Sequence, residues 1–154
     1  MLFRSSAIGD FNYDGKPDLV WTNTVTGERS IWLMNGTVFG SGISLGTLSN
    51  AWKIATTADL NGDGKTDLIW QNTSSGECSV WLMNGGALAS GVVLDTLPVQ
   101  WSIVGSGDFN GDGKADLLLQ NTVTGERVVR LMNRTTFLST VSLGIYPTNL
   151  SIKN

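Results

Sequence analysis

Short apolar runs, each bounded by turn-forming residues such as Gly, Asn or Ser, follow one another along the whole chain. The middle third contains four such runs, at residues 52–58, 67–70, 78–84 and 87–94. No segment sustains the i, i+3, i+4 apolar spacing of an amphipathic helix, whereas short runs between turn signals are typical of strands. Runs such as LVW at 19–21 and IWLM at 31–34 are apolar on both faces, as in a sheet that lies between two others. The pattern predicts an all-β fold.

The same pattern occurs three times at a constant spacing. Asp10, Asp59 and Asp108 each open a stretch of nearly the same sequence, and 49 residues separate each from the next. A fixed period of this length indicates stacked supersecondary units, and four short strands per unit are typical of a propeller blade. We therefore predict a β-propeller built from four-stranded blades. It forms a single unit over 1–154, with blades at about 3–51, 52–100 and 101–149 and the start of a further strand at 150–154.

Three blades do not close a ring, since propellers usually have roughly 4–8 blades. Phe3, Trp52, Trp101 and Leu150 occupy equivalent positions, so the chain holds three repeats and the beginning of a fourth. Three blades alone would expose two large apolar faces. Either the chain is part of a longer propeller, or copies of it assemble into a ring. Among homo-oligomers we favour a dimer over a trimer, because a dimer has a blade number within the usual range.

Each repeat begins with an acidic loop that reads D-x-N-x-D-G-K-x-D. Side-chain oxygens at positions 1, 3, 5 and 9, with a backbone carbonyl at position 7, can surround one hard cation. Three carboxylates per loop favour Ca²⁺, which accepts an irregular oxygen shell, over Mg²⁺. The loop is not an EF-hand, because its position 12 is Trp21, Trp70 or Leu119 instead of Glu. Metal-free Asp-rich turns are the alternative, but three copies in the same register favour calcium.

The repeated loop resembles the FG-GAP/VCBS family of calcium-binding propeller repeats, which includes integrin α-subunit propellers and a fungal propeller lectin. The resemblance covers almost the whole chain, although the FG and GAP signatures are poorly kept: AIGDFN and GSGDFN are recognisable, TTADLN less so. It implies a loop between the first two strands of each blade and one structural Ca²⁺ per loop, three per chain. The implied ligands, with each lysine contributing its carbonyl, are Asp10, Asn12, Asp14, Lys16, Asp18, Asp59, Asn61, Asp63, Lys65, Asp67, Asp108, Asn110, Asp112, Lys114 and Asp116.

Composition excludes several other functions. Of the 154 residues, 41% are hydrophobic and 15% charged, and the net charge of −3 provides no basic surface for nucleic acid or an anionic membrane. No apolar stretch approaches the ~20 residues of a membrane span. The chain has no histidine, which removes His-based catalysis and His-ligated zinc. Because the repeated Asp residues are assigned to calcium, we predict no catalytic residue and no enzyme activity.

The single cysteine, Cys78, cannot form an internal disulfide. Arg29 and Arg127 occupy the equivalent positions in the other two repeats, and such long charged side chains indicate a position that faces solvent. We therefore predict a free, solvent-facing and inert thiol at Cys78.

The six tryptophans all lie at repeated positions and allow two interpretations. A Trp ring can stack on the apolar side of a sugar, or it can fill the space between blades, where large rings bury most apolar area. Core packing is the favoured interpretation for any one of them. The candidate ligand-binding residues are Trp21, Trp32, Trp70 and Trp81. Exposed turn charges are likewise favoured over ligand contacts for Glu28, Glu77 and Glu126.

The third repeat departs from the other two. Leu119 replaces a Trp, Arg130 replaces Trp32 and Trp81, and Arg134 replaces a Gly. Because a buried, unpaired Arg is costly, we expect this blade to border solvent, a different blade or a partner copy.

The favoured function is a calcium-binding, non-catalytic recognition module that binds carbohydrate as a lectin does or acts in adhesion, with a glycan or an extracellular protein as partner. The alternative is a structural or assembly segment of a larger protein, with no small-ligand site of its own. Weak calcium sites suit an environment rich in calcium, so we expect a secreted or cell-surface protein, although residues 1–11 contain no signal peptide.

Overall fold

Twelve β-strands run through residues 3–152, which the computed structural model describes except for the side chains of Phe3 and Ser5. Blade 1 contains β1 (Phe3–Gly9), β2 (Asp18–Asn23), β3 (Glu28–Asn35) and β4 (Val38–Thr47). Blade 2 contains β5 (Trp52–Ala58), β6 (Asp67–Asn72), β7 (Glu77–Asn84) and β8 (Ala87–Thr96). Blade 3 contains β9 (Trp101–Gly107), β10 (Asp116–Asn121), β11 (Glu126–Asn133) and β12 (Thr136–Ile145).

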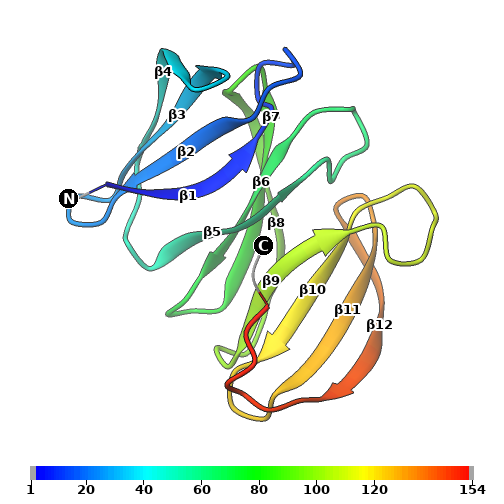
Figure 1. Cartoon of the computed structure of the whole chain (residues 1–154). Helices are drawn as coiled ribbons and strands as arrows, with labels where there is room; N and C mark the ends of the chain where they lie inside the picture. Colours follow the sequence, from blue (N-terminus) through cyan, green and yellow to red (C-terminus); the bar gives the residue numbers. More distant parts are fainter. Residues whose placement is uncertain (1–2, 153–154) are drawn as a thin grey trace.

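Each blade is one antiparallel sheet in which every strand pairs with the next along the chain. Figure 1 shows the three sheets one after another, with β5 between β1 and β9, so the first strand of each blade lies beside the first strand of its neighbour. The sheets do not close into a ring. The all-β prediction is confirmed, and so are the four strands expected in residues 52–100. Within residues 3–152, no helix is long and apolar enough to cross a membrane.

Two apolar clusters join the blades face to face. The first lies between blades 1 and 2 and includes Val20, Ile31 and Trp70, each at most 1% exposed. The second lies between blades 2 and 3. Blade 2 is therefore covered on both faces, which explains why β6 is buried at five consecutive positions. Within the part of the chain that the structure describes, blades 1 and 3 each keep one face without a neighbouring sheet.

Irregular pairing interrupts the sheets at equivalent places. The register between the first two strands shifts between Ser5 and Ala7 in blade 1 and between Ile54 and Thr56 in blade 2. Two further shifts occur between the third and fourth strands of every blade. Such bulges add local twist to a sheet. Nothing in the alternation of apolar and polar residues predicted them.

The prediction that Cys78 faces solvent is wrong. Cys78 is 2% exposed and belongs to the cluster between blades 2 and 3, and burial raises the pKa of its thiol to about 11. Its counterpart Arg29 is 1% exposed, and its guanidinium donates to the carbonyls of Leu48 at 3.0 Å and Trp52 at 2.7 Å. An Arg at this position therefore caps backbone carbonyls where two blades meet, so it does not indicate exposure.

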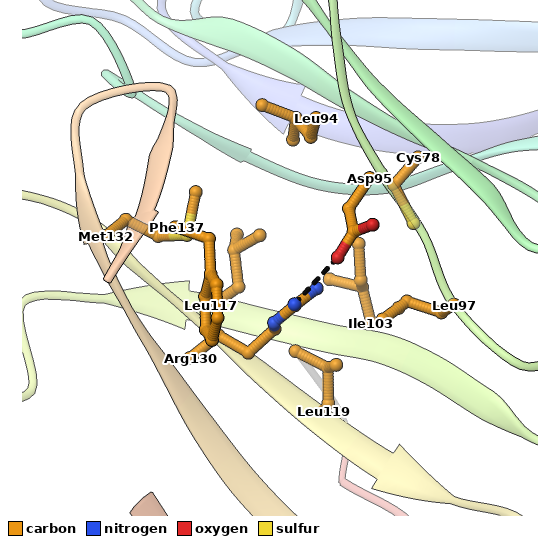
Figure 2. A pocket seen from close by; sticks show the side chains of 10 residues that line it. All are labelled: Cys78, Leu94, Asp95, Leu97, Ile103, Leu117, Leu119, Arg130, Met132 and Phe137. Atoms are coloured by element: carbon orange, nitrogen blue, oxygen red, sulfur yellow. Dashed lines mark hydrogen bonds and ion pairs between the residues drawn. The ribbon is translucent and has the colours of Figure 1, made fainter. Parts of the chain in front are cut away.

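Arg130 in blade 3 reaches the neighbouring blade. Figure 2 shows its guanidinium directed at the Asp95 carboxylate of β8, and Nη2 lies 2.7 Å from Oδ2. The same guanidinium lies over the ring of Phe137, 4.1 Å from its centroid. Of the three neighbours expected for this blade, which were solvent, a different blade or a partner copy, Arg130 contacts another blade, and the charge that replaces two tryptophans is paired.

Candidate metal sites

The three acidic loops join the first two strands of their blades and share one hydrogen-bonded turn. In blade 2, Asp59 Oδ1 accepts the amides of Gly62 at 2.7 Å and Asp63 at 3.0 Å, and Oδ2 accepts the amide of Gly64 at 2.8 Å. Asp10 and Asp108 accept the corresponding amides of their own loops. The first Asp of each loop therefore fixes the turn through its carboxylate.

Positions 4 and 6 of the loop require a left-handed backbone. Gly64 at position 6 has φ of 81°, and Gly62 at position 4 has φ of 77°. In blade 1 position 4 is Tyr13, which adopts φ of 64° despite its side chain. Its hydroxyl accepts the amide of Gly85 at 3.1 Å, in the turn between β7 and β8. This contact links the loop of one blade to the next blade, and the sequence pattern did not predict it.

The oxygens at positions 3 and 5 lie on the exposed side of the loop. In blade 2, Asn61 Oδ1 accepts the amide of Asp63 at 3.0 Å, and Asp63 Oδ1 accepts the amide of Lys65 at 2.9 Å. The ammonium of Lys65 points away to Asn84, where it donates to Oδ1 at 2.9 Å. The backbone of Lys65 thus belongs to the loop while its side chain ties the loop to the end of β7.

The Asp at position 9 differs from the others because it is completely buried. Asp18, Asp67 and Asp116 are each 0% exposed. Asp67 accepts the amide of Leu60 through Oδ2 and that of Met83 through Oδ1, both at 3.0 Å. The pKa of Asp67 lies above its ordinary value, mainly because burial disfavours the charged carboxylate. The hydrogen bonds from Leu60 and Met83 partly oppose this rise, and the charge of Asp63 adds to it. Position 9 therefore anchors the loop to the third strand, a role that the loop motif alone did not predict.

The donor set of each loop fits a hard cation in chemistry, since it consists of carboxylate, amide and carbonyl oxygens only. A carboxylate offers about four acceptor sites, so the backbone hydrogen bonds leave capacity for a cation. Across residues 3–152, however, no three acidic or Cys side chains form a group arranged to hold a metal ion. The first Asp of each loop organises the turn through its hydrogen bonds, and the oxygens of the loop have the ligand chemistry that suits Ca²⁺.

The four candidate ligand-binding tryptophans form two pairs in different surroundings. The rings of Trp70 and Trp81 lie 4.9 Å apart between blades 1 and 2, and Trp70 is 1% exposed. The rings of Trp21 and Trp32 lie 5.1 Å apart on blade 1, and Trp32 is 37% exposed beside the ring of Phe39. Burial favours the core-packing interpretation for Trp70. The three repeated glutamates are the first residues of three different strands, β3, β7 and β11, and are not brought together.

Comparison with known proteins identifies the repeat. The model of the FG-GAP-like repeat matches residues 10–70 and 59–119. Curated proteins provide no match. The solved structure of a Photorhabdus luminescens Tc holotoxin pore contains a chain that aligns with 96% of this one at 19% identity and a TM-score of 0.58, and the aligned part is 7% of that chain. At this identity the likeness concerns the fold alone. The chain belongs to the FG-GAP-like repeat family.

Proposed function

We propose that this FG-GAP-like repeat protein is a calcium-stabilised, non-catalytic propeller segment with a structural role, and that each acidic loop holds one Ca²⁺. The buried Asp at position 9 of every loop carries the proposal. Among the described residues, no Lys or Arg forms an ion pair with Asp18, Asp67 or Asp116. A buried carboxylate is costly unless its charge is compensated, and a bound divalent cation would compensate it.

The structural role is supported by how the blades use their apolar residues. The two clusters join sheet to sheet, and residues 3–152 hold the same four-stranded unit three times over. A similar fold also occurs as a small part of a much longer chain. These observations favour a segment that holds other parts in place over a self-contained recognition domain.

Two substitutions in one loop test the calcium assignment. Asp63→Asn keeps an acceptor for the Lys65 amide but removes an exposed charge, so calorimetry should count two calcium ions per chain instead of three. Each filled site stabilises the folded protein by about 2.7 kcal/mol when the free calcium concentration is 100 times Kd. Loss of one of the three sites should therefore lower the total stabilisation by calcium by about a third. Without calcium, Asp63→Asn should unfold at nearly the wild-type temperature.

Asp67→Asn should behave differently, because a carboxamide cannot accept both the Leu60 and Met83 amides. It should lower the unfolding temperature even in EDTA, where calcium plays no part. Glu28→Gln, at the exposed first residue of β3, is the matched control and should leave both calcium stoichiometry and stability unchanged. Three ions bound by Asp63→Asn, or an equal melting temperature of the wild type in calcium and EDTA, would contradict the assignment.

Carbohydrate recognition is the second candidate function, and the exposed Trp32 next to Trp21 and Phe39 favours it. A glycan array probed in calcium and again in EDTA tests it. Calcium-dependent binding to a related set of sugars, lost in Trp32→Arg, would support a lectin. In either case an extracellular or cell-surface location suits sites that depend on abundant calcium.

A further inference from the structure

The two open faces of the molecule are copies of faces that are covered within it. On blade 2, Leu68 and Trp70 pack against blade 1 and are at most 1% exposed. Their counterparts on blade 1, Leu19 and Trp21, are only half-buried, because no other sheet formed by residues 3–152 packs on this face. We call this surface the open face of blade 1; it consists of Leu19, Trp21, Trp32 and Met34.

Blade 3 presents the complementary surface. On blade 2, Leu60 and Leu97 lie in the cluster against blade 3 and are 1% and 8% exposed. Their counterparts Phe109 and Tyr146 are 51% and 43% exposed. We call this surface the open face of blade 3; it consists of Phe109, Leu118, Val141, Leu143 and Tyr146.

At both blade junctions within the chain, a face equivalent to the open face of blade 3 packs against a face equivalent to the open face of blade 1. A second copy of this chain therefore carries the surface that each open face lacks. Such a contact joins two different faces, so it is heterologous, and it closes only when the blade number completes a ring. Two copies bring six blades, which is within the usual range of about 4–8.

One contact shows how the copies would join. At the junction of blades 1 and 2, the guanidinium of Arg29 lies over the Trp70 ring, 5.2 Å from its centroid. The corresponding residues at the open faces are Arg127 on blade 3 and Trp21 on blade 1. Arg127 already repeats part of the arrangement, since its Nη2 donates to the Leu150 carbonyl at 2.5 Å as Arg29 donates to that of Trp52. The Arg127 guanidinium lies over the ring of Tyr146 in its own blade, 4.9 Å from the centroid, and the Trp of a following blade is the part of the arrangement that residues 3–152 do not provide.

We propose that two copies of this chain close a six-bladed ring through two identical contacts, each between the open face of blade 3 and the open face of blade 1, with Arg127 of one copy stacked on Trp21 of the other. This inference rests on the proposed structural role and names its partner. Leu150–Ile152 of one copy would meet the start of β1 of the next, because both occupy one position in the repeat. We expect the C-terminal residues to move aside and β1 to keep its place, since β1 is paired with β2 along its length.

Sedimentation equilibrium in calcium, with variants of each face, tests the proposal. The wild type should have twice the 16.5 kDa chain mass. Trp32→Arg and Leu143→Arg each alter one face and therefore both contacts of the ring, so each alone should weaken dimerisation at least ~10-fold. Val123→Arg is the control: this turn residue is 73% exposed, and its counterpart Ser74 stays exposed between two blades.

Mixing the two face variants separates a heterologous contact from a symmetric one. An equal mixture of Trp32→Arg and Leu143→Arg retains one unaltered pair of faces and should recover a one-to-one dimer. A monomeric wild type, a trimer or open series, a dimeric Trp32→Arg variant, or no recovery on mixing would each overturn the proposal. Calcium stoichiometry of the monomeric variants should stay at three, so a failed dimer and a failed calcium assignment give different results.

Discussion

Different side chains donate to the equivalent backbone carbonyl in different blades. In blade 1, Arg29 caps the carbonyl of Trp52. In blade 2 the equivalent residue is Cys78, which cannot do so, and Gln71 donates instead to the Trp101 carbonyl at 2.7 Å and accepts the Ile103 amide at 3.0 Å. A buried carbonyl requires a partner, but the partner can come from either of two neighbouring strands.

This alternation predicts a paired rescue. Arg29→Cys should lower the free energy of unfolding by about 2–3 kcal/mol, because it leaves the carbonyls of Leu48 and Trp52 without their charged donor. Adding Thr22→Gln, which introduces the glutamine of blade 2, should restore about 1 kcal/mol. Urea unfolding of the wild type, both single variants and the double variant measures this. If Thr22→Gln destabilised the two backgrounds equally, the interpretation of Gln71 as a substitute cap would fail.

At the scale of elements, one partly exposed ion pair, Arg130 with Asp95, links β11 to β8. The hydrogen bond from Arg130 is the main reason that the pKa of Asp95 lies below its ordinary value, and burial opposes it. The Asp95 side chain is 44% exposed, so solvent screens the pair and its contribution is at most about 1 kcal/mol.

The lowered pKa predicts how pH affects Asp95→Asn. Because the carboxyl loses its proton more readily in the folded than in the unfolded state, the pair stabilises the protein above the unfolded pKa of about 3.9 and is lost as pH falls through the lower folded value. Asp95→Asn should therefore be less stable than the wild type at pH 7, by up to about 1 kcal/mol, and the gap should shrink below about pH 4. Chemical unfolding across this range measures it. In an Arg130→Met background the pH-dependent difference should vanish; its persistence there would exclude the pair as the cause.

The elements themselves were largely predictable. Runs of apolar residues between turn signals indicated all four strands of residues 52–100, because strand length and alternation are local properties. The bulges were not predictable, since they arise from pairing between strands and leave no mark in one strand's composition. The double role of Asp67 was missed for a similar reason: the loop motif records its spacing, but the Met83 amide that it accepts lies on a later strand.

For the whole molecule, the acidic loops determine net charge. The formal charge is −3 without metal, and three bound Ca²⁺ ions would make it +3. Capillary electrophoresis at pH 7 should therefore show migration toward the anode in EDTA and toward the cathode in calcium. Equal mobility in the two buffers would contradict filling of the loops. Dimerisation doubles the charge without changing its sign, so this measurement is independent of assembly.

The sequence by itself determined the period, the all-β class, the approximate positions of the strands in residues 52–100 and the location of the acidic loops, because these depend on neighbours along the chain. Only the tertiary structure decided which of several equivalent residues is buried. Trp70 is 1% exposed while Trp21, at the same place in the repeat, is only half-buried. Likewise Cys78 and Arg29 are both buried although one is small and apolar and the other charged. The physical reason is that burial comes from the sheet packed on each face, and a repeat describes its own strands but not the blade beside it.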